Sequence, residues 1–184
     1  MNDSFENVNI NLDPTYNEYG YGINCDIQVQ AYNNLFKDGL WFHLEPFTAS
    51  AGDWTFTDNL FDHVHLVQDV NEPLDYNYNG YWPLSAEALA YDYNFYSWYV
   101  NNTNELQTTT TGDGFTDGGN EVTLNSAPPY QSGTFGDFYL PGTTPLYGAG
   151  SRSPAAAGLY QYTTRIDQTK EGEETSGHMV NIGI

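Results

Sequence analysis

A short phrase of asparagine and aromatic residues recurs along the first half of this chain. Three copies are closely alike and a fourth is weaker: Tyr32–Phe36, Thr57–Phe61, Asp75–Asn79 and Asp92–Tyr96. The shared asparagines, Asn34, Asn59, Asn77 and Asn94, are 25, 18 and 17 residues apart. Recurrence at such a spacing is typical of repeat architectures, in which each unit covers its neighbour. The sequence therefore predicts a short β-solenoid.

Local patterns agree with an all-β chain. Apolar and polar residues alternate in four short stretches that we expect to be strands: Val8–Leu12, Ile27–Ala31, Trp54–Thr57 and Val64–Val67. Helical periodicity is scarce, and its best candidate, Leu84–Tyr91, would make one or two turns. A conventional β-sandwich is the alternative architecture.

The chain is long enough for one domain, in which we distinguish three parts. Residues 1–100 carry the repeated phrases and would form the solenoid. Residues 101–121 are polar and rich in glycine and threonine, which predicts a loop. Strand-like pieces interrupted by prolines return in residues 122–184, and we expect this loop-rich segment to wrap over the coil.

In a solenoid, equivalent positions stack at the strand spacing of about 4.8 Å. Inward asparagines can then bond side chain to side chain along a ladder. We expect Leu35, Leu60 and the aromatic residues that follow them to stack inside the same coil.

The charge balance limits the partners of the chain. Four basic residues face twenty-four acidic ones, which gives a formal charge of −20. Such a chain repels nucleic-acid phosphates and anionic membranes, so neither is an expected partner. No apolar run is long enough to enter a membrane, and residues 1–6 lack the features of an export signal, so we expect a soluble chain.

The repeats contain three related phrases, Asn33–Phe36, Asp58–Asp62 and Tyr78–Tyr81. The later part of the chain contains Phe135–Tyr139, Ala149–Ser153, Ala157–Thr164 and Val180–Gly183. The first set resembles the rungs, and the second set the closing segment, of right-handed parallel β-helix regions in large secreted proteins from planctomycete and verrucomicrobial bacteria. The resemblance implies an extracellular or cell-surface β-helix module and implies no particular reaction.

Two groups of residues could hold a metal ion. Asp113, Asp117 and Glu121 recur every four residues in a glycine-rich loop, a pattern suited to a hard cation such as calcium, although a solvated turn is the interpretation we favour. His63 and His65 share one face of an expected strand, with Asp62 or Asp69 as a further ligand. No other cofactor is expected.

The aromatic residues suggest a way to bind sugars. Trp41, Trp54, Trp82 and Trp98 could offer ring faces as a platform for glycans. The sequence thus predicts a non-catalytic module with a structural or adhesive role, with polysaccharide or another copy of the chain as partner. A polysaccharide hydrolase or lyase on the same scaffold is the alternative, with Asp58, Asp62, Asp75 and Asp92 as candidate carboxylates and Lys37 as a base.

Overall fold

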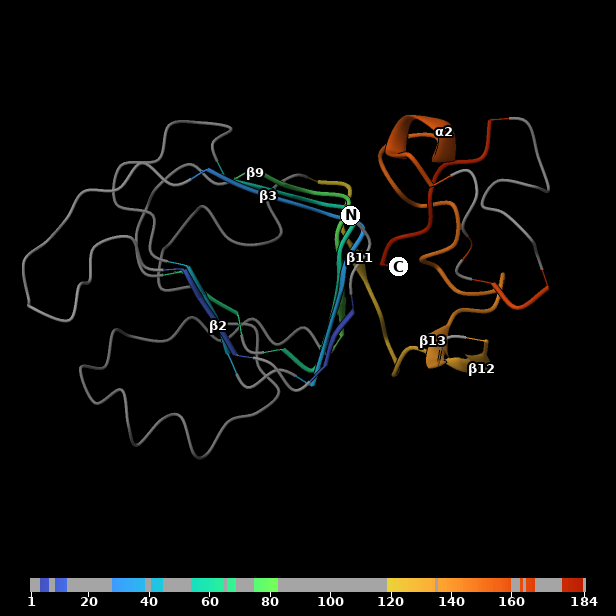
Figure 1. Cartoon of the computed structure of the whole chain (residues 1–184), viewed down its shortest axis with the longest axis horizontal. Coiled ribbons are helices and arrows are strands. Elements are labelled where there is room, and N and C mark those ends of the chain that lie inside the picture. The colour runs from blue at the N-terminus through green and yellow to red at the C-terminus, as the bar shows by residue number, and fades with distance from the viewer. Residues whose placement is uncertain are drawn as a thin grey trace, which may run out of the picture.

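The computed structural model of this chain describes residues 4–6, 9–12, 28–38, 41–44, 54–64, 66–68, 75–82, 119–134, 136–159, 163, 165–167 and 177–183. Within this part, nearly all regular structure is β-strand, which confirms the all-β prediction (Figure 1). The helix α2 (Pro154–Ala157) spans four residues between an N-cap at Ser153 and a left-handed Gly158. No helix in the described residues is both long and apolar enough to cross a membrane.

Eleven strands form three parallel sheets. The largest consists of β1 (Ser4–Glu6), β4 (Leu35–Lys37), β7 (Leu60–Asp62), β10 (Gly80–Trp82) and β11 (Val122–Thr123), in that spatial order. The second consists of β2 (Asn9–Leu12), β5 (Trp41–Leu44) and β8 (Leu66–Gln68). The third consists of β3 (Val29–Tyr32), β6 (Trp54–Thr57) and β9 (Asp75–Asn77).

The chain passes through the three sheets in a fixed order, so that each strand from β4 to β9 pairs with the strand three positions earlier in the chain. After β1, β2 and β3, the strands β4, β5 and β6 pair with them in parallel, and β7, β8 and β9 pair with the second set in turn. In Figure 1 the three sheets run in different directions, and the five-stranded sheet lies between the other two and the C-terminal segment. That segment comprises the described residues from Leu124 to Gly183.

Left-handed corners lie at both ends of β4 and β7 and at the start of β10 in the five-stranded sheet. Asn33, Asp58 and Tyr78 precede β4, β7 and β10 with φ of 55°, 64° and 57°, while Asp38 and His63 follow β4 and β7 with φ of 52°. Asparagine and aspartate tolerate this conformation better than most residues because their short side chains bond locally. The corners let the backbone turn between sheets without a glycine at these positions.

A ladder of asparagine side chains runs across the corners, as predicted. The Nδ2 atom of Asn34 donates to Oδ1 of Asn59 at 3.0 Å, and Nδ2 of Asn59 donates to Oδ1 of Asn79 at 3.2 Å. Each receiving oxygen also accepts the backbone N–H of the donor residue, at 3.0 Å. The Nδ2 atoms of Asn59 and Asn79 donate to the carbonyls of Ala31 and Phe56. All three amides are buried and bonded.

The third member of the ladder was predicted wrongly. Asn77 does not take this position, because Gly80 pairs with Leu60 and the residue before Gly80 is Asn79. The Oδ1 atom of Asn77 instead accepts from the backbone of Tyr78 and from Nδ2 of Asn120. The expected fourth member, Asn94, and the expected helix at 84–91 lie outside the described residues.

One face of the five-stranded sheet carries a stack of aromatic rings. Phe36, Phe61 and Tyr81 are in register, with ring centroids 5.0 and 5.5 Å apart and nearly parallel planes. In the third sheet, Phe56 and Tyr76 stack in the same way at 4.9 Å. Such pairs add about 0.5–1.5 kcal/mol each beyond the burial of their area.

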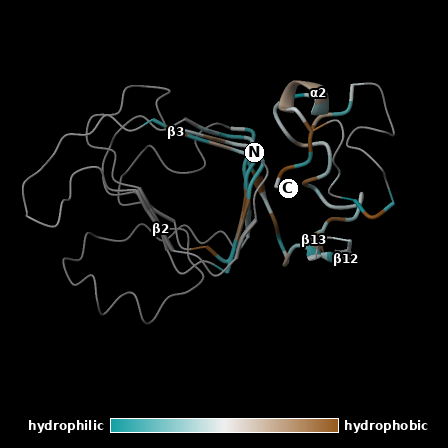
Figure 2. Ribbon diagram, in the orientation of Figure 1, coloured by the Kyte–Doolittle hydropathy of each residue, from teal (hydrophilic) through white to brown (hydrophobic). Residues whose placement is uncertain are grey.

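The leucines of this sheet face the C-terminal segment rather than the aromatic stack, which corrects the expectation that both lie inside the coil. Alternation along a strand turns Leu35 and Leu60 to the opposite face from Phe36 and Phe61. There they form a buried cluster with Leu124, Leu140, Leu146 and Ile182. Figure 2 shows hydrophobic residues both in the five-stranded sheet and in the C-terminal segment that faces it.

The rest of the C-terminal segment is mostly irregular. The strands β12 (Gln131–Gly133) and β13 (Gly136–Tyr139) form a short antiparallel pair. Backbone hydrogen bonds also tie the end of the chain to earlier residues, since Ile182 donates to the carbonyl of Leu146 at 3.0 Å and Gly183 to that of Asp58 at 2.8 Å. The segment therefore covers the leucine face of the five-stranded sheet.

Candidate functional site

Ionisable and aromatic side chains gather where β4, β7 and β10 end. We call this group the strand-end cluster; its members are Lys37, Asp38, Asp62, His63, Trp82 and Tyr130. The parallel register sets Lys37 beside Asp62, and Asp62 beside Trp82. These three residues follow Leu35, Leu60 and Gly80 by two positions, so they point to the side that the C-terminal segment covers.

Asp62 is the centre of the strand-end cluster. Its Oδ1 lies 2.9 Å from Nδ1 of His63, and its Oδ2 accepts the hydroxyl of Tyr130 at 2.7 Å. Nδ1 of His63 also lies 3.7 Å from Oδ1 of Asp38. Asp62 thus joins strand β7 to a residue 68 positions later in the chain.

The remaining members surround this centre. Lys37 Nζ pairs with Oδ2 of Asp38 at 2.5 Å and lies 5.9 Å from the centre of the Tyr130 ring. The ring of Trp82 meets the ring of His63 edge to face, with centroids 4.0 Å apart. The cluster therefore combines two carboxylates, an imidazole and an amine within a few ångströms.

Burial decides what this cluster can do chemically. The side chain of Asp62 is 2% exposed, and burial raises its pKa, against the opposing effects of Tyr130 and His63. The charge of Asp38 raises the pKa of Asp62 further. Because both oxygens of Asp62 already have partners and almost none of its surface meets solvent, this carboxylate cannot reach a bulky substrate. It fixes Tyr130 in place instead.

A second buried carboxylate, Asp58, lies just before β7 and binds another residue of the C-terminal segment, Ser151. Its Oδ1 accepts the backbone N–H of Ser151 at 2.6 Å, and its Oδ2 accepts the hydroxyl of Ser151 at 2.8 Å. Arg152 Nε lies 3.4 Å from Oδ2. Burial raises the pKa of Asp58, while the hydrogen bonds from Ser151 and the charge of Arg152 act in the opposite direction.

Arg152 also reaches the preceding corner. Its guanidinium lies 4.5 Å from the ring centre of Tyr32, and Nη2 donates to Oδ1 of Asn33 at 3.3 Å. Asn33 in turn donates from Nδ2 to the carbonyl of Asn181. The C-terminal segment is therefore attached at both ends of β7, through polar contacts that flank the leucine cluster.

The predicted calcium loop is almost entirely outside the described part of the chain. Asp113 and Asp117 are outside the described residues, whereas Glu121 is described and lies half-buried just before β11. Among the described residues, no group of three or more histidine, cysteine, aspartate or glutamate side chains is placed to hold a metal ion. The calcium site stays a prediction. For the histidine pair, His65 and Asp69 are outside the described residues, and His63 contacts Asp62.

The tryptophans proposed as a glycan platform are distributed over the fold. Trp41 begins β5 and Trp54 begins β6, so their backbones lie in two different sheets, and their side chains are outside what the structure describes. Trp82 ends β10 in the five-stranded sheet, is partly buried, and packs against the leucine cluster as well as His63. Trp98 is outside the described residues.

The sequence interpretation missed Tyr130, Ser151 and Arg152. One signal could have predicted an ion pair at Arg152: with only four basic residues among twenty-four acidic ones, each basic side chain is expected to lie beside a carboxylate. Lys37, Arg152 and Arg165 indeed pair with Asp38, Asp58 and Asp167. Which aspartate each would choose is not written in the local sequence.

Comparison with known proteins gives no functional assignment, so the function is inferred from the geometry described above. No protein-family model matches the chain, and no curated protein or solved structure is significantly similar to it.

Proposed function

We propose that the chain folds as a short right-handed parallel β-helix with its C-terminal segment as a lateral cover. Three observations support the proposal: the parallel pairing in all three large sheets, the fixed order in which the chain visits them, and the asparagine ladder at equivalent corners. The right hand is the usual hand of crossovers between parallel strands. The β-sandwich alternative would instead pair its strands antiparallel.

On this scaffold we propose a non-catalytic, extracellular module with a structural or adhesive role. The observation that carries the proposal is the use of Asp58 and Asp62. These buried carboxylates bind the chain's own C-terminal segment, through Ser151 and Tyr130, and so stabilise the covered sheet. The adhesive partner that we favour is a neutral polysaccharide, since the charge of −20 repels anionic partners. Another copy of the chain is the other candidate partner.

One observation favours a second function, that of a polysaccharide-acting enzyme. Asp38 and Asp62 both lie within 4 Å of the same imidazole nitrogen, and paired carboxylates are what glycoside hydrolysis requires. Asp38 is 40% exposed and could meet a substrate, whereas Asp62 is sealed. The sealed partner is why we rank this function second.

Binding and cleavage assays separate the two functions. The purified chain is incubated with insoluble neutral and acidic polysaccharides, and both its co-sedimentation and the release of soluble sugar are measured. We expect binding without release. Release of sugar that is abolished by Asp38→Asn, and unaffected by the matched change Asp137→Asn on the exposed side of β13, would overturn the proposal in favour of the enzyme.

A further inference from the structure

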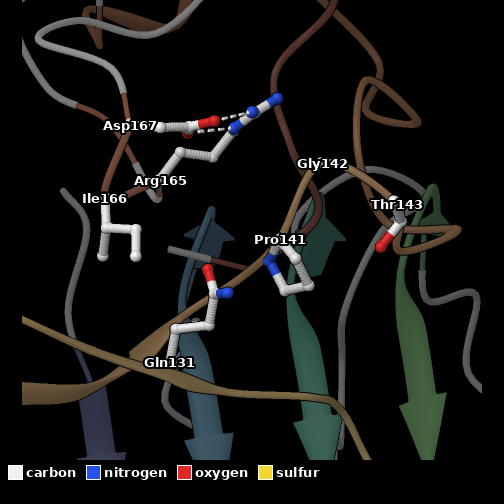
Figure 3. Close-up of a pocket in the computed structure, with 7 residues that line it drawn as sticks. All are labelled: Gln131, Pro141, Gly142, Thr143, Arg165, Ile166 and Asp167. Atoms are coloured by element: carbon white, nitrogen blue, oxygen red, sulfur yellow. Dashed lines mark hydrogen bonds and ion pairs between the residues drawn. The ribbon is translucent and has the colours of Figure 1, made fainter.

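The C-terminal segment contains a pocket whose lining includes no member of the strand-end cluster. Its volume is about 450 Å³, within the range of roughly 300–1,000 Å³ found for small-molecule sites. The residues that line it are Gln131, Pro141, Gly142, Thr143, Arg165, Ile166 and Asp167 (Figure 3). They come from strand β12 and from two stretches of irregular chain.

An arginine with a fixed orientation forms one wall of this pocket. Arg165 donates from Nε to Oδ1 of Asp167 at 2.7 Å and from Nη2 to Oδ2, the parallel pair drawn in Figure 3. Its Cζ lies 4.9 Å from the ring centre of Tyr147. A Cβ at position 142 would overlap Nη1 of Arg165, so the guanidinium packs directly against the backbone of Gly142. Packing and pairing together orient the guanidinium.

Asp167 presents the opposite character. Its side chain is 60% exposed, whereas that of Arg165 is 11% exposed. The hydrogen bond from Arg165 lowers the pKa of Asp167, which keeps the carboxylate ionised and able to accept further hydrogen bonds. A carboxylate oxygen has lone pairs beyond the one used by its first donor. The pocket thus offers an oriented acceptor at its open side.

The other walls combine neutral polar and apolar groups. Gln131 carries an amide and Thr143 a hydroxyl, and within the described residues neither side chain makes a hydrogen bond. Ile166 is a large apolar residue that is 52% exposed, and Figure 3 shows its side chain and that of Gln131 on the same side of the pocket. Pro141 adds a second apolar surface.

We propose that this pocket binds a terminal neutral sugar of a glycan, with adjacent hydroxyls on Asp167 and the amide of Gln131 and the C–H face of the ring on Ile166. A sugar matches the mixture of donors, acceptors and apolar surface in this pocket. An anionic ligand fits less well, because Asp167 already neutralises Arg165 and the chain carries a charge of −20. The inference rests on the adhesive form of the proposed function.

Sugar titrations of the wild-type chain and two variants test the inference. The probes are the methyl glycosides of glucose, galactose, mannose and xylose, with glucuronate as the anionic comparison, and binding is followed by saturation-transfer NMR and calorimetry. We expect at least one neutral glycoside to bind and Asp167→Asn to weaken it tenfold or more. Asp137→Asn, which makes the same charge change on exposed β13, should leave the affinity unchanged.

Each contrary result has a clear meaning. If no neutral glycoside binds at 20-fold molar excess and millimolar concentration, or if glucuronate binds more tightly, the pocket is not a sugar site. If a glycoside binds equally to wild-type chain and Asp167→Asn, binding occurs elsewhere and the inference fails, while the adhesive function stands. Gln131→Met removes the amide that the proposal places on a sugar hydroxyl and keeps the charge of the chain. It should also weaken binding, and it provides a second pocket variant should Asp167→Asn lower the melting temperature.

Discussion

At the scale of single residues, the asparagines of the ladder are chosen for their amide chemistry. Each side chain carries both a donor and an acceptor, so identical residues can bond to one another in a column without repulsion. Asn59 shows the full pattern, accepting from the backbone and side chain of Asn34 and donating to Asn79 and to the carbonyl of Ala31. An aspartate in the column would bury a charge and lose both donors.

Replacing Asn79 by alanine should therefore destabilise the fold more than replacing Asn77. The first change leaves the backbone N–H of Asn59 and the carbonyl of Phe56 buried without their partner, and we expect a loss of about 2–4 kcal/mol in the free energy of unfolding. Asn77→Ala removes partly exposed contacts and should lose less than about 1 kcal/mol. Urea unfolding of both variants measures the difference. Equal losses would contradict the assignment of Asn79 to the ladder.

The buried aspartates predict a pH dependence of stability. Burial raises the pKa of Asp62 above its ordinary 3.8, so the folded protein holds this proton more tightly than the unfolded chain does. The contribution of Asp62 to the free energy of unfolding is then greatest below pH 3.8 and declines as the pH rises through the raised pKa. We expect Asp62→Asn to remove this decline.

Denaturant titrations of both proteins between about pH 3.5 and pH 7 check this prediction. Lys37, Asp38, His63 and Tyr130 are present in both, so the difference between the two curves reports on Asp62. Curves that stay parallel across the whole range would show that the carboxylate keeps an ordinary pKa in the fold.

At the scale of elements, the fit between the five-stranded sheet and its cover depends on a glycine. A Cβ at position 80 would lie 2.7 Å from Cδ2 of Leu146 and 3.1 Å from side-chain atoms of Ile182 and Leu60. The position that leucine fills in β4 and β7 is therefore filled in β10 by side chains of the C-terminal segment. The repeat is interrupted at the place where the cover inserts.

Gly80→Ala should push the C-terminal segment away from the sheet. Overpacking of this kind lowers stability by about 1–3 kcal/mol. Leu146→Ala opens a cavity on its own, yet in the double variant it makes room for the new methyl group. We expect the two changes together to destabilise less than their separate effects predict, by about 0.5–3 kcal/mol in a double-mutant cycle. Additive losses would mean that the two residues do not meet.

The elements that sequence reasoning predicted are those with a local signal. Alternation located β2 and β6, most of β3 and part of β8, and the asparagine phrase located the corners before β4 and β7. The phrase failed at β10 because Gly80 replaces the leucine, so that Tyr76-Asn77-Tyr78 resembled the other copies better than Asn79-Gly80-Tyr81 did.

The polar attachments of the cover could not be predicted in this way. Tyr130 meets an aspartate 68 residues earlier, and Ser151 meets one 93 residues earlier. No periodicity connects such pairs, because they form only once the cover has settled on the sheet. The outward direction of Leu35 and Leu60 depends on the same cover, since a leucine face needs an apolar partner.

At the scale of the whole molecule, most of the acidic residues behind the charge of −20 have no basic residue to neutralise them, because only four basic residues are present. Within the described residues, Lys37, Arg152 and Arg165 are each paired with an aspartate, so little positive charge is left to offset the other carboxylates. Repulsion among these carboxylates is stronger in the compact state than in the extended chain. Screening should therefore favour folding.

We expect the melting temperature to rise when sodium chloride is raised from about 10 mM to 1 M, because the screening length falls from roughly 30 to 3 Å.

Melting curves with calcium distinguish this general screening effect from a specific metal site at Asp113, Asp117 and Glu121. For a solvated turn, millimolar calcium, magnesium and chelator give the same melting curve at matched ionic strength, which is the result we expect. A site with an affinity in the range of about 0.1–1 mM would instead add roughly 1.4–2.7 kcal/mol at 10 mM calcium, and magnesium would add less. A calcium-specific shift in calorimetric scans, lost in Asp117→Asn, would therefore establish the metal site and refute the solvated turn.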